Sequence, residues 1–337
     1  MTRRILPLLL VAAIVCGWVV FQRRGTAPLV VYCAHDSIYA EAILRDFTRQ
    51  TGIAVSARYD TEATKSLGLV ELLVREKDAP RCDVFWNNEL LGTLDLKEKG
   101  VLAPYMGPGW ERIPARFRDA EGHWAGFAAR LRVYIFNTDA IAMTDRGMPL
   151  HLPADFSRWA IAKPLYGTTL THYSVLWQRW GREKLIAWHS EMRAGGAREL
   201  GGNAAVKDAV AAGACDLGFT DTDDFFDAKD AGKPVAMRPV RLEGGATICI
   251  PNTVAVIRGT RREPDARRLV NFLLSSETEL ALARSKSRQI PLGPVAGDQV
   301  PAEVRELMRW AADGVPLADL REARAECLAW LRSEYLR

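Results

Sequence analysis

Short apolar runs alternate with amphipathic segments from Leu29 to the end of the chain. The runs are four to seven residues long, as expected for strands of a buried sheet, and they lie at 29–33, 53–59, 83–86, 159–162 and 216–220. Segments with apolar residues three and four positions apart follow most of these runs and predict helices, for example over 63–77 and 182–194. The alternation predicts an α/β fold in which helices cover both faces of mainly parallel sheets.

Two pairs of extended segments interrupt this alternation, and we expect them to be strands that cross twice between two lobes. The pairs are 126–129 with 131–136, and 246–250 with 253–257. The predicted lobes are 28–128 plus 250–285 for the first and 129–249 plus 286–337 for the second. A stretch rich in Pro and Gly at 104–114 predicts a loop over the surface.

The first 25 residues have the pattern of an export signal. Arg3 and Arg4 precede an uncharged apolar run over 5–21, and Arg23 and Arg24 follow it. A basic segment followed by such a run is typical of a signal peptide or of an uncleaved signal anchor, and the sequence leaves both open. In either case we expect residues 26–337 to work in the periplasm or another extracytoplasmic space, with 5–21 as the candidate anchor in the inner membrane.

Charge and cysteine content exclude several other classes of protein. The net charge of +4 comes from the four arginines of the leader, so the rest of the chain is neutral and no basic cluster suggests a nucleic-acid partner. Five cysteines follow the leader, and their spacing matches no zinc pattern. A disulfide between Cys33 and Cys82 is left open, since an oxidising compartment would permit it.

Polar residues gather where the predicted strands end and the helices begin. The sets that concern ligand binding are His35, Asn87 with Asn88, Gly167 with Thr168 and Thr169, Asn203, and Asp221 with Asp223 and Asp224. In open α/β sheets ligands bind beyond the carboxyl ends of the strands, although each set could also simply cap a helix. Three carboxylates within four positions exceed what a cap needs, and they repel one another unless a cation, an arginine or hydrogen bonds offset the charge.

Three further side chains are candidates for the same cleft. Arg130 and Arg132 alternate along a predicted strand and therefore share a face, from which one could clamp an anion; a surface ion pair is the alternative. His172 lies one turn into a predicted helix and is expected to face the cleft rather than the core.

At these positions the chain resembles a known family, the class II solute-binding proteins of bacterial ABC importers, and within it the ferric-iron-binding branch. The similarity runs from Val30 to about Leu292, and its motifs lie at 31–35, 82–86, 126–130, 161–169, 217–224 and 250–254. The resemblance implies two lobes joined by a hinge, with a mainly parallel sheet flanked by helices in each lobe. It also implies a ligand trapped between the lobes and delivered to a permease and ATPase complex.

The resemblance assigns roles to individual residues. His35 matches a family histidine, Arg130 matches the anion-binding arginine, and Gly167 to Thr169 match the anion-binding loop. The paired tyrosines that hold iron in the family fall at Asp223 and Asp224, and its glutamate falls at Asn88. The resemblance therefore implies a metal ion, Fe³⁺ or another hard cation, on His35, Asp223 and Asp224, together with an oxyanion.

We expect a monomeric, non-enzymatic binding component that captures a metal ion, an oxyanion or both. One alternative is a binding protein for a phosphorylated or phosphonate solute. A less favoured alternative is an aspartate-dependent phosphatase that uses Asp221 and Asp223, since no later Lys and acidic pair accompanies that motif at comparable strand ends. Whether the protein serves transport or sensing is left open.

Overall fold

The structure is a computed structural model that describes residues 27–60, 67–142 and 155–336. The predicted signal or anchor over 1–25 lies outside these residues. Among the described residues, no helix combines the length and the apolar character needed to cross a membrane.

The first lobe is built on a sheet in which β1 (Leu29–Cys33) lies between two parallel neighbours. Its other strands are β2 (Val55–Tyr59), β3 (Val84–Asn87), the short β4 (Leu102–Ala103) and one half of β10 (Cys249–Ile257). Strands β2 and β3 run parallel to β1, whereas β10 is antiparallel to β3. The helices of this lobe are α2 (Ser37–Thr51), α3 (Leu67–Arg75), α4 (Leu91–Glu98), α5 (Pro108–Arg112), α10 (Glu263–Leu273) and α11 (Ser276–Arg284).

Alternation along β1 explains how helices cover both faces of this sheet. Val31 and Cys33 are buried in one core together with residues of α2 and α10. Tyr32 points to the opposite face and lies in a second core with residues of α3 and α4. A strand that is apolar on both faces is the pattern of a covered parallel sheet, as the sequence predicts.

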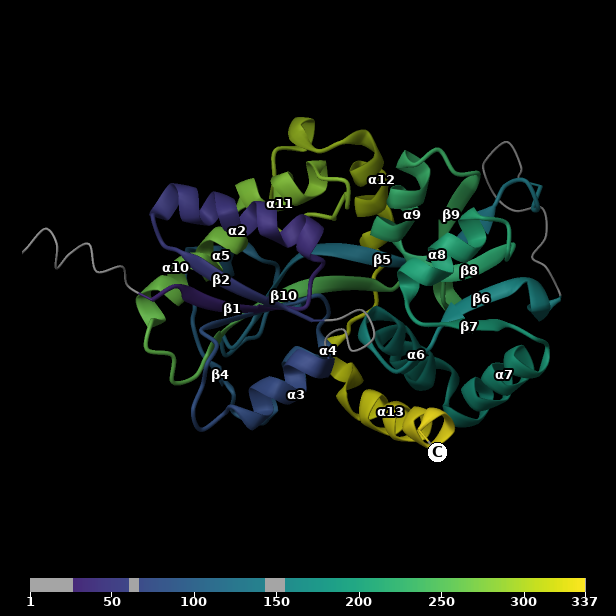
Figure 1. The fold of residues 1–337 in the computed structure, drawn as a ribbon, viewed down its shortest axis with the longest axis horizontal. Coiled ribbons are helices and arrows are strands. Elements are labelled where there is room, and N and C mark those ends of the chain that lie inside the picture. The colour runs from purple at the N-terminus through teal and green to yellow at the C-terminus, as the bar shows by residue number, and fades with distance from the viewer. Residues whose placement is uncertain (1–26, 61–66, 143–154, 337) are drawn as a thin grey trace, which may run out of the picture.

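The second lobe repeats this plan. Its parallel strands are β6 (Trp159–Ala162), β7 (Arg198–Leu200) and β8 (Leu217–Asp221), and β9 (Val235–Pro239) is antiparallel to β5. Its helices are α6 (Gly167–Trp180), α7 (Arg182–Ala194), α8 (Asn203–Ala211) and α9 (Thr222–Asp230). Two more, α12 (Ala302–Ala311) and α13 (Arg321–Tyr335), end the chain on opposite sides of the molecule (Figure 1).

Two strands run through both lobes and join their sheets. β5 (Ala125–Asn137) and β10 are neighbours in the continuous order β2-β1-β3-β10-β5-β8-β6-β7. The sequence predicts each crossing as two short strands, but each is one continuous strand. Ala128 has a left-handed φ of 44° and the pairing shifts between Ile250 and Asn252, so both strands bend where the apolar runs are interrupted.

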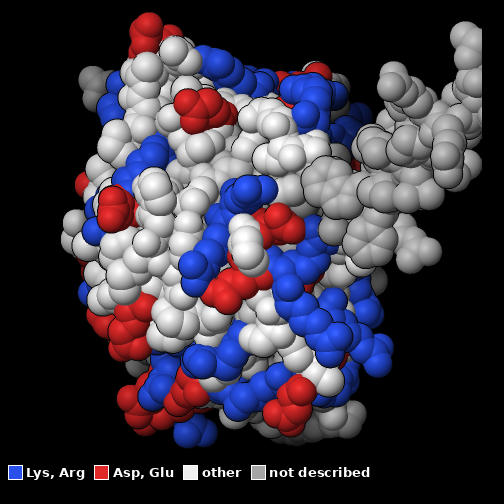
Figure 2. Space-filling view, turned by 90° about the vertical axis from the view of Figure 1, so that its left-hand side faces the viewer, with Lys and Arg blue, Asp and Glu red and all other residues white. Residues whose placement is uncertain are grey.

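The α/β fold with two lobes and two crossing strands is confirmed, and the boundaries predicted for the lobes stay predictions. The prediction of a loop over 104–114 is wrong in part, because Pro108 begins the short helix α5. Cys82 carries a free, buried thiol, so the described residues contain no Cys33–Cys82 disulfide. The end of the first lobe carries interspersed acidic and basic side chains rather than a continuous basic surface (Figure 2).

Candidate functional site

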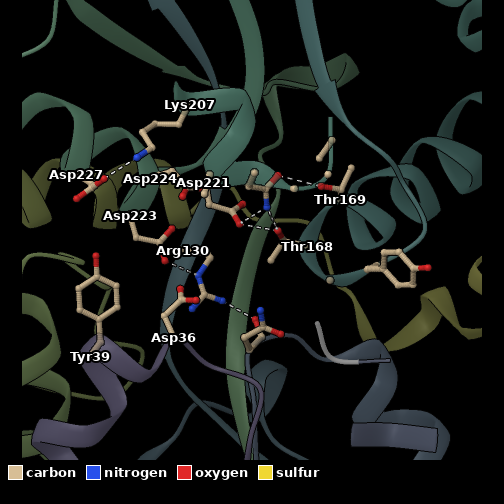
Figure 3. A pocket seen from close by; sticks show the side chains of 18 of the residues that line it. Asp36, Tyr39, Arg130, Thr168, Thr169, Lys207, Asp221, Asp223, Asp224 and Asp227 are labelled. Atoms are coloured by element: carbon tan, nitrogen blue, oxygen red, sulfur yellow. Dashed lines mark hydrogen bonds and ion pairs between the residues drawn. The ribbon is translucent and has the colours of Figure 1, made fainter. Parts of the chain in front are cut away.

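A pocket of about 270 Å³ lies where the helices α2, α6, α8 and α9 begin. Its walls therefore come from both lobes, since α2 belongs to the first lobe and the other three to the second. Nine residues that the sequence singled out line it: Asn88, Arg130, Gly167, Thr168, Thr169, Asn203, Asp221, Asp223 and Asp224. In Figure 3, Asp223, Asp224 and Asp227 lie toward one side, Thr168 and Thr169 toward the other, and Arg130 between them.

Arg130 of β5 is a buried link between the two lobes. Its Nη1 donates to the backbone oxygen of Asn88 at 2.5 Å, and its Nη2 donates to Oδ1 of Asn252 at 2.9 Å. Its Nε donates to Oδ2 of Asp223 at 3.2 Å, and this ion pair reaches the first turn of α9. Only 2% of Arg130 is exposed, and that part faces the pocket.

Arg132 lies behind the pocket wall. Its Nη1 donates to Oδ1 of Asp221 at 2.8 Å and to Oδ1 of Asn203 at 3.0 Å. The other oxygen of Asp221 accepts from the hydroxyl of Thr168 at 2.5 Å and from Nδ2 of Asn203 at 3.1 Å. The alternative of a surface ion pair is therefore wrong for both arginines, because each is buried against an aspartate of the same cluster.

The remaining carboxylates form the acidic side of the pocket. Asp221, Asp223 and Asp224 each offer one oxygen within 4.8 Å of the others. Burial, followed by the negative charges of Asp223 and Asp221, raises the pKa of Asp224 well above its usual range. The hydroxyl of Thr220 donates to Asp224 at 2.6 Å and partly offsets this cost. The oxygen donors suit a hard cation, which would relieve the repulsion among these groups.

The opposite side of the pocket suits an anion. Gly167 begins α6 with a left-handed φ of 52°, and Thr168 and Thr169 follow it in the first turn. Asn203 at the start of α8 is fixed against them, since its Oδ1 accepts from the Thr169 hydroxyl at 3.0 Å. Helix N-termini carry unpaired N–H groups and partial positive charge, and Lys163 adds a full charge to the lining.

The chain is similar in sequence to two periplasmic or iron-uptake proteins. No protein-family model matches the chain. It is 27% identical over 195 residues to the "Fe(3+)-binding periplasmic protein" of Serratia marcescens, a match that covers 56% of this chain and 55% of that protein, or about half its length. It is 24% identical over 268 residues to "Iron uptake protein A1" of Synechocystis, covering 75% and 71% of the two chains.

Solved structures agree with these matches. Iron-bound HitA from Pseudomonas aeruginosa superposes with a TM-score of 0.79 at 21% identity, covering 91% of this chain and 99% of HitA. The periplasmic binding protein AfuA from Actinobacillus pleuropneumoniae, with fructose-6-phosphate bound, gives a TM-score of 0.74 at 17% identity and covers 91% and 98%. The fold is that of a type II periplasmic binding protein.

Three predicted site residues of this periplasmic-binding-protein fold lie outside the pocket lining. His35 is buried behind Arg130, with its Nδ1 3.3 Å from Arg130 Nη2 and its ring stacked on Trp86. Asn87 is fully buried and donates from Nδ2 to Glu89 and Thr93.

His172 is the third of these residues, and the expectation that it faces the cleft is wrong. It is 2% exposed and packs edge-to-face on Phe219, with the ring centroids 5.3 Å apart. Burial, and then the positive charge of Arg132, lowers its pKa well below 6.5 and keeps the ring neutral. The aromatic core of the second lobe continues through this position of α6, so the helix turns His172 inward.

Several residues that line the pocket are not predicted by the sequence pattern. They are Asp36, Ser37, Ile38, Tyr39, Lys163, Tyr166, Lys207 and Asp227, with the small residues around them. Lys207 of α8 is held by Asp227 at 2.7 Å. The periodicity of α2 assigns Tyr39 to the core face, yet it stands in the first helical turn beside the pocket. The position of Tyr39 in the first turn of α2, close to the end of β1, is the sequence feature that indicates a place beside the pocket.

Proposed function

We propose that the protein is the extracytoplasmic substrate-binding component of an ABC importer, which captures a metal ion, an oxyanion or both for delivery to a permease and ATPase. The pocket between the lobes carries this proposal, because it is walled by both lobes and has an acidic and a basic side. Movement of the lobes about β5 and β10 would enclose a ligand there and exclude water, which strengthens every charged contact. The similar proteins named for iron binding and iron uptake support this class of function.

Asp223 and Asp224 are the residues we propose to hold a metal ion. Both lie in the first turn of α9, and one oxygen of each lies within 4.8 Å of the other and of an oxygen of Asp221. Fe³⁺ is a hard cation that prefers oxygen ligands, so the donor set fits it as a substrate. His35 supports this site indirectly, since it contacts Arg130 instead of the cavity.

Titration with ferric citrate and with inorganic phosphate, followed by calorimetry, tests this function. We expect one site per chain and loss of the ferric signal in Asp224→Asn. Asp46→Asn, a variant of a half-buried aspartate of α2 outside the pocket lining, should show no such loss. Binding of neither probe would contradict the metal and oxyanion proposal.

A phosphorylated organic solute is the second candidate. AfuA, a structural neighbour, is described with fructose-6-phosphate bound. In the present chain Arg130 already neutralises Asp223, and Lys163, Lys207 and the N-termini of α6 and α8 face the same cavity. Calorimetry with fructose 6-phosphate in place of ferric citrate distinguishes this candidate, since a sugar phosphate should bind without any metal.

An aspartate-dependent phosphatase is not supported by the geometry. A nucleophilic carboxylate needs an oxygen that can reach phosphorus, but both oxygens of Asp221 are engaged by Arg132, Thr168 and Asn203. We therefore propose a binding function without catalysis in the periplasm, with 5–21 as an export signal or membrane anchor and the monomer as the working form.

A further inference from the structure

The last helix, α13, contacts both lobes at a distance from the pocket. Its apolar face, with Cys327, Leu328 and Leu331, is buried in one continuous core with residues of α6. Trp330 lies against Trp177 of α6 with ring centroids 5.7 Å apart, and Nε1 of Trp177 donates to Glu326 at 2.9 Å. These contacts attach α13 firmly to the second lobe.

Three arginines of α13 reach the first lobe. Arg321 pairs with Glu98 and Arg324 with Asp95, both on α4, and Arg332 lies 3.5 Å from Glu71 on α3. Arg324 is only 7% exposed, so its pair with Asp95 is shielded from solvent, whereas Arg321 and Glu98 are exposed. The same helix thus packs mainly on α6 of the second lobe and ion-pairs with the first lobe, whose helices α3 and α4 contribute to the same apolar core.

The two helices that α13 joins are those that position the pocket walls. Helix α4 begins directly after the segment that carries Asn88, whose carbonyl oxygen holds Arg130. Helix α6 begins with the residues at 167–169 on the opposite wall. Any change in the distance between α4 and α6 therefore changes the width of the pocket.

A buried carboxylate provides a second link between these helices. Glu89 is 4% exposed and accepts from the backbone N–H groups of Leu91 and Gly92 at 2.5 and 2.7 Å, which fixes the start of α4. It also accepts from the hydroxyl of Thr171 of α6 at 3.4 Å. Burial raises the pKa of Glu89, and the positive charge of Arg324 opposes that shift, so α13 contributes to the contact between the lobes as well as bridging it.

We propose that α13 is a tether that sets the angle between the lobes, with Arg321 and Arg324 as positioning residues for ligand binding. Loss of their ion pairs lets α4 move away from α6, which widens the ligand-free pocket and weakens binding without any change in the residues that line it. The claim that these residues affect ligand affinity rests on the proposed function. The claim that they set the angle between the lobes does not.

Small-angle X-ray scattering of the ligand-free protein tests the tether directly. We expect Arg321→Gln/Arg324→Gln to increase the radius of gyration relative to the parent protein. Arg45→Gln, which breaks an exposed ion pair within α2, should leave it unchanged. An unchanged radius in the folded double variant overturns the proposal, even if its melting temperature falls, because α13 would then contribute only packing.

Reversing the charges of the exposed pair of Arg321 and Glu98 tests the tether even if the double variant does not fold. Arg321→Glu should open the molecule, and adding Glu98→Arg should restore the parent radius, because both side chains are exposed. Failure of the second change to restore it contradicts the tether.

Calorimetry with ferric citrate and fructose 6-phosphate then measures the effect on binding. We expect Kd to rise about threefold to tenfold in the double variant for any probe that the parent binds. If neither probe binds the parent, the proposed function fails while the scattering result still decides the tether.

Discussion

Arg130 and Arg132 occupy alternate positions of β5, and the aspartate that each one meets determines its role. Arg130 contacts Asp223 and keeps one edge in the pocket, so it is placed to meet a ligand. Arg132 is fully buried against Asp221 and supports the wall from behind. The alternation predicts their shared face, but it does not reveal which arginine is covered.

Replacing Arg132 should destabilise the protein strongly. Arg132→Met leaves Asp221 as a buried carboxylate without its cation, and we expect unfolding in urea to require about 3–5 kcal/mol less free energy. Arg158→Met removes an arginine from a partly exposed pair with Asp216, and its effect should be much smaller. Equal losses of unfolding free energy in the two variants would contradict a larger contribution of the buried pair of Arg132 and Asp221.

His189 should make stability depend on pH. It is buried between the hydroxyls of Tyr173 and Tyr335 at 2.9 and 3.0 Å. Burial, followed by the charge of Arg193, lowers its pKa to about 4. The native state therefore binds fewer protons than the unfolded chain between about pH 6.5 and 4, so its contribution is complete above pH 6.5 and is lost as the pH falls through that window.

Urea unfolding across this pH range measures the contribution of His189. We expect His189→Gln to flatten the fall in unfolding free energy between pH 6.5 and 4 by up to about 3 kcal/mol. A variant with the parent slope would show that another group causes the pH dependence.

At the scale of the element, one carboxylate organises the bend in β5. Glu279 of α11 is fully buried and accepts from the backbone N–H of Ala128 at 2.9 Å, and also from Leu292 and Gly293. Its other partner is Arg112, at 2.7 Å. The strained φ of Ala128 is thus held by a helix that lies far away in the sequence.

Glu279→Gln should weaken this junction. The amide removes the charge that pairs with Arg112 and turns an NH₂ group toward backbone donors, so we expect a loss of about 3–5 kcal/mol in urea. Glu277→Gln, on the exposed face of the same helix, is the matched control and should change stability little. Similar curves for the two variants would contradict this role of Glu279.

Element boundaries show what periodicity can and cannot predict. The helix predicted over 182–194 is observed at those residues, because its apolar spacing is uninterrupted. The crossing at 126–136 is predicted as two strands, since Arg130, which is buried, interrupts the apolar run. The burial of Arg130 depends on Asp223, about 90 positions further along the chain, and the bend at Ala128 depends on Glu279, about 150 positions further along. Local periodicity cannot predict such distant contacts.

At the scale of the whole molecule, the sequence predicts the two-lobed architecture and most of one wall of the pocket. Strand ends converge by topology, so the residues at 167–169 and 221–224 meet as expected. The contribution of Lys207 depends on how the lobes face each other, and local patterns contain no such information. The same holds for His172, whose side is decided by the aromatic core.

Native mass spectrometry with elemental analysis, on protein purified without denaturant and incubated with ferric citrate, phosphate or fructose 6-phosphate, most directly tests whether this pocket binds a solute. We predict one added ligand mass per chain, and a phosphate or sugar phosphate mass that is absent from folded Arg130→Gln but present in Arg45→Gln. Unliganded masses with every probe, or equal loading of parent and Arg130→Gln with a phosphate probe that the parent binds, would contradict a binding site between the lobes.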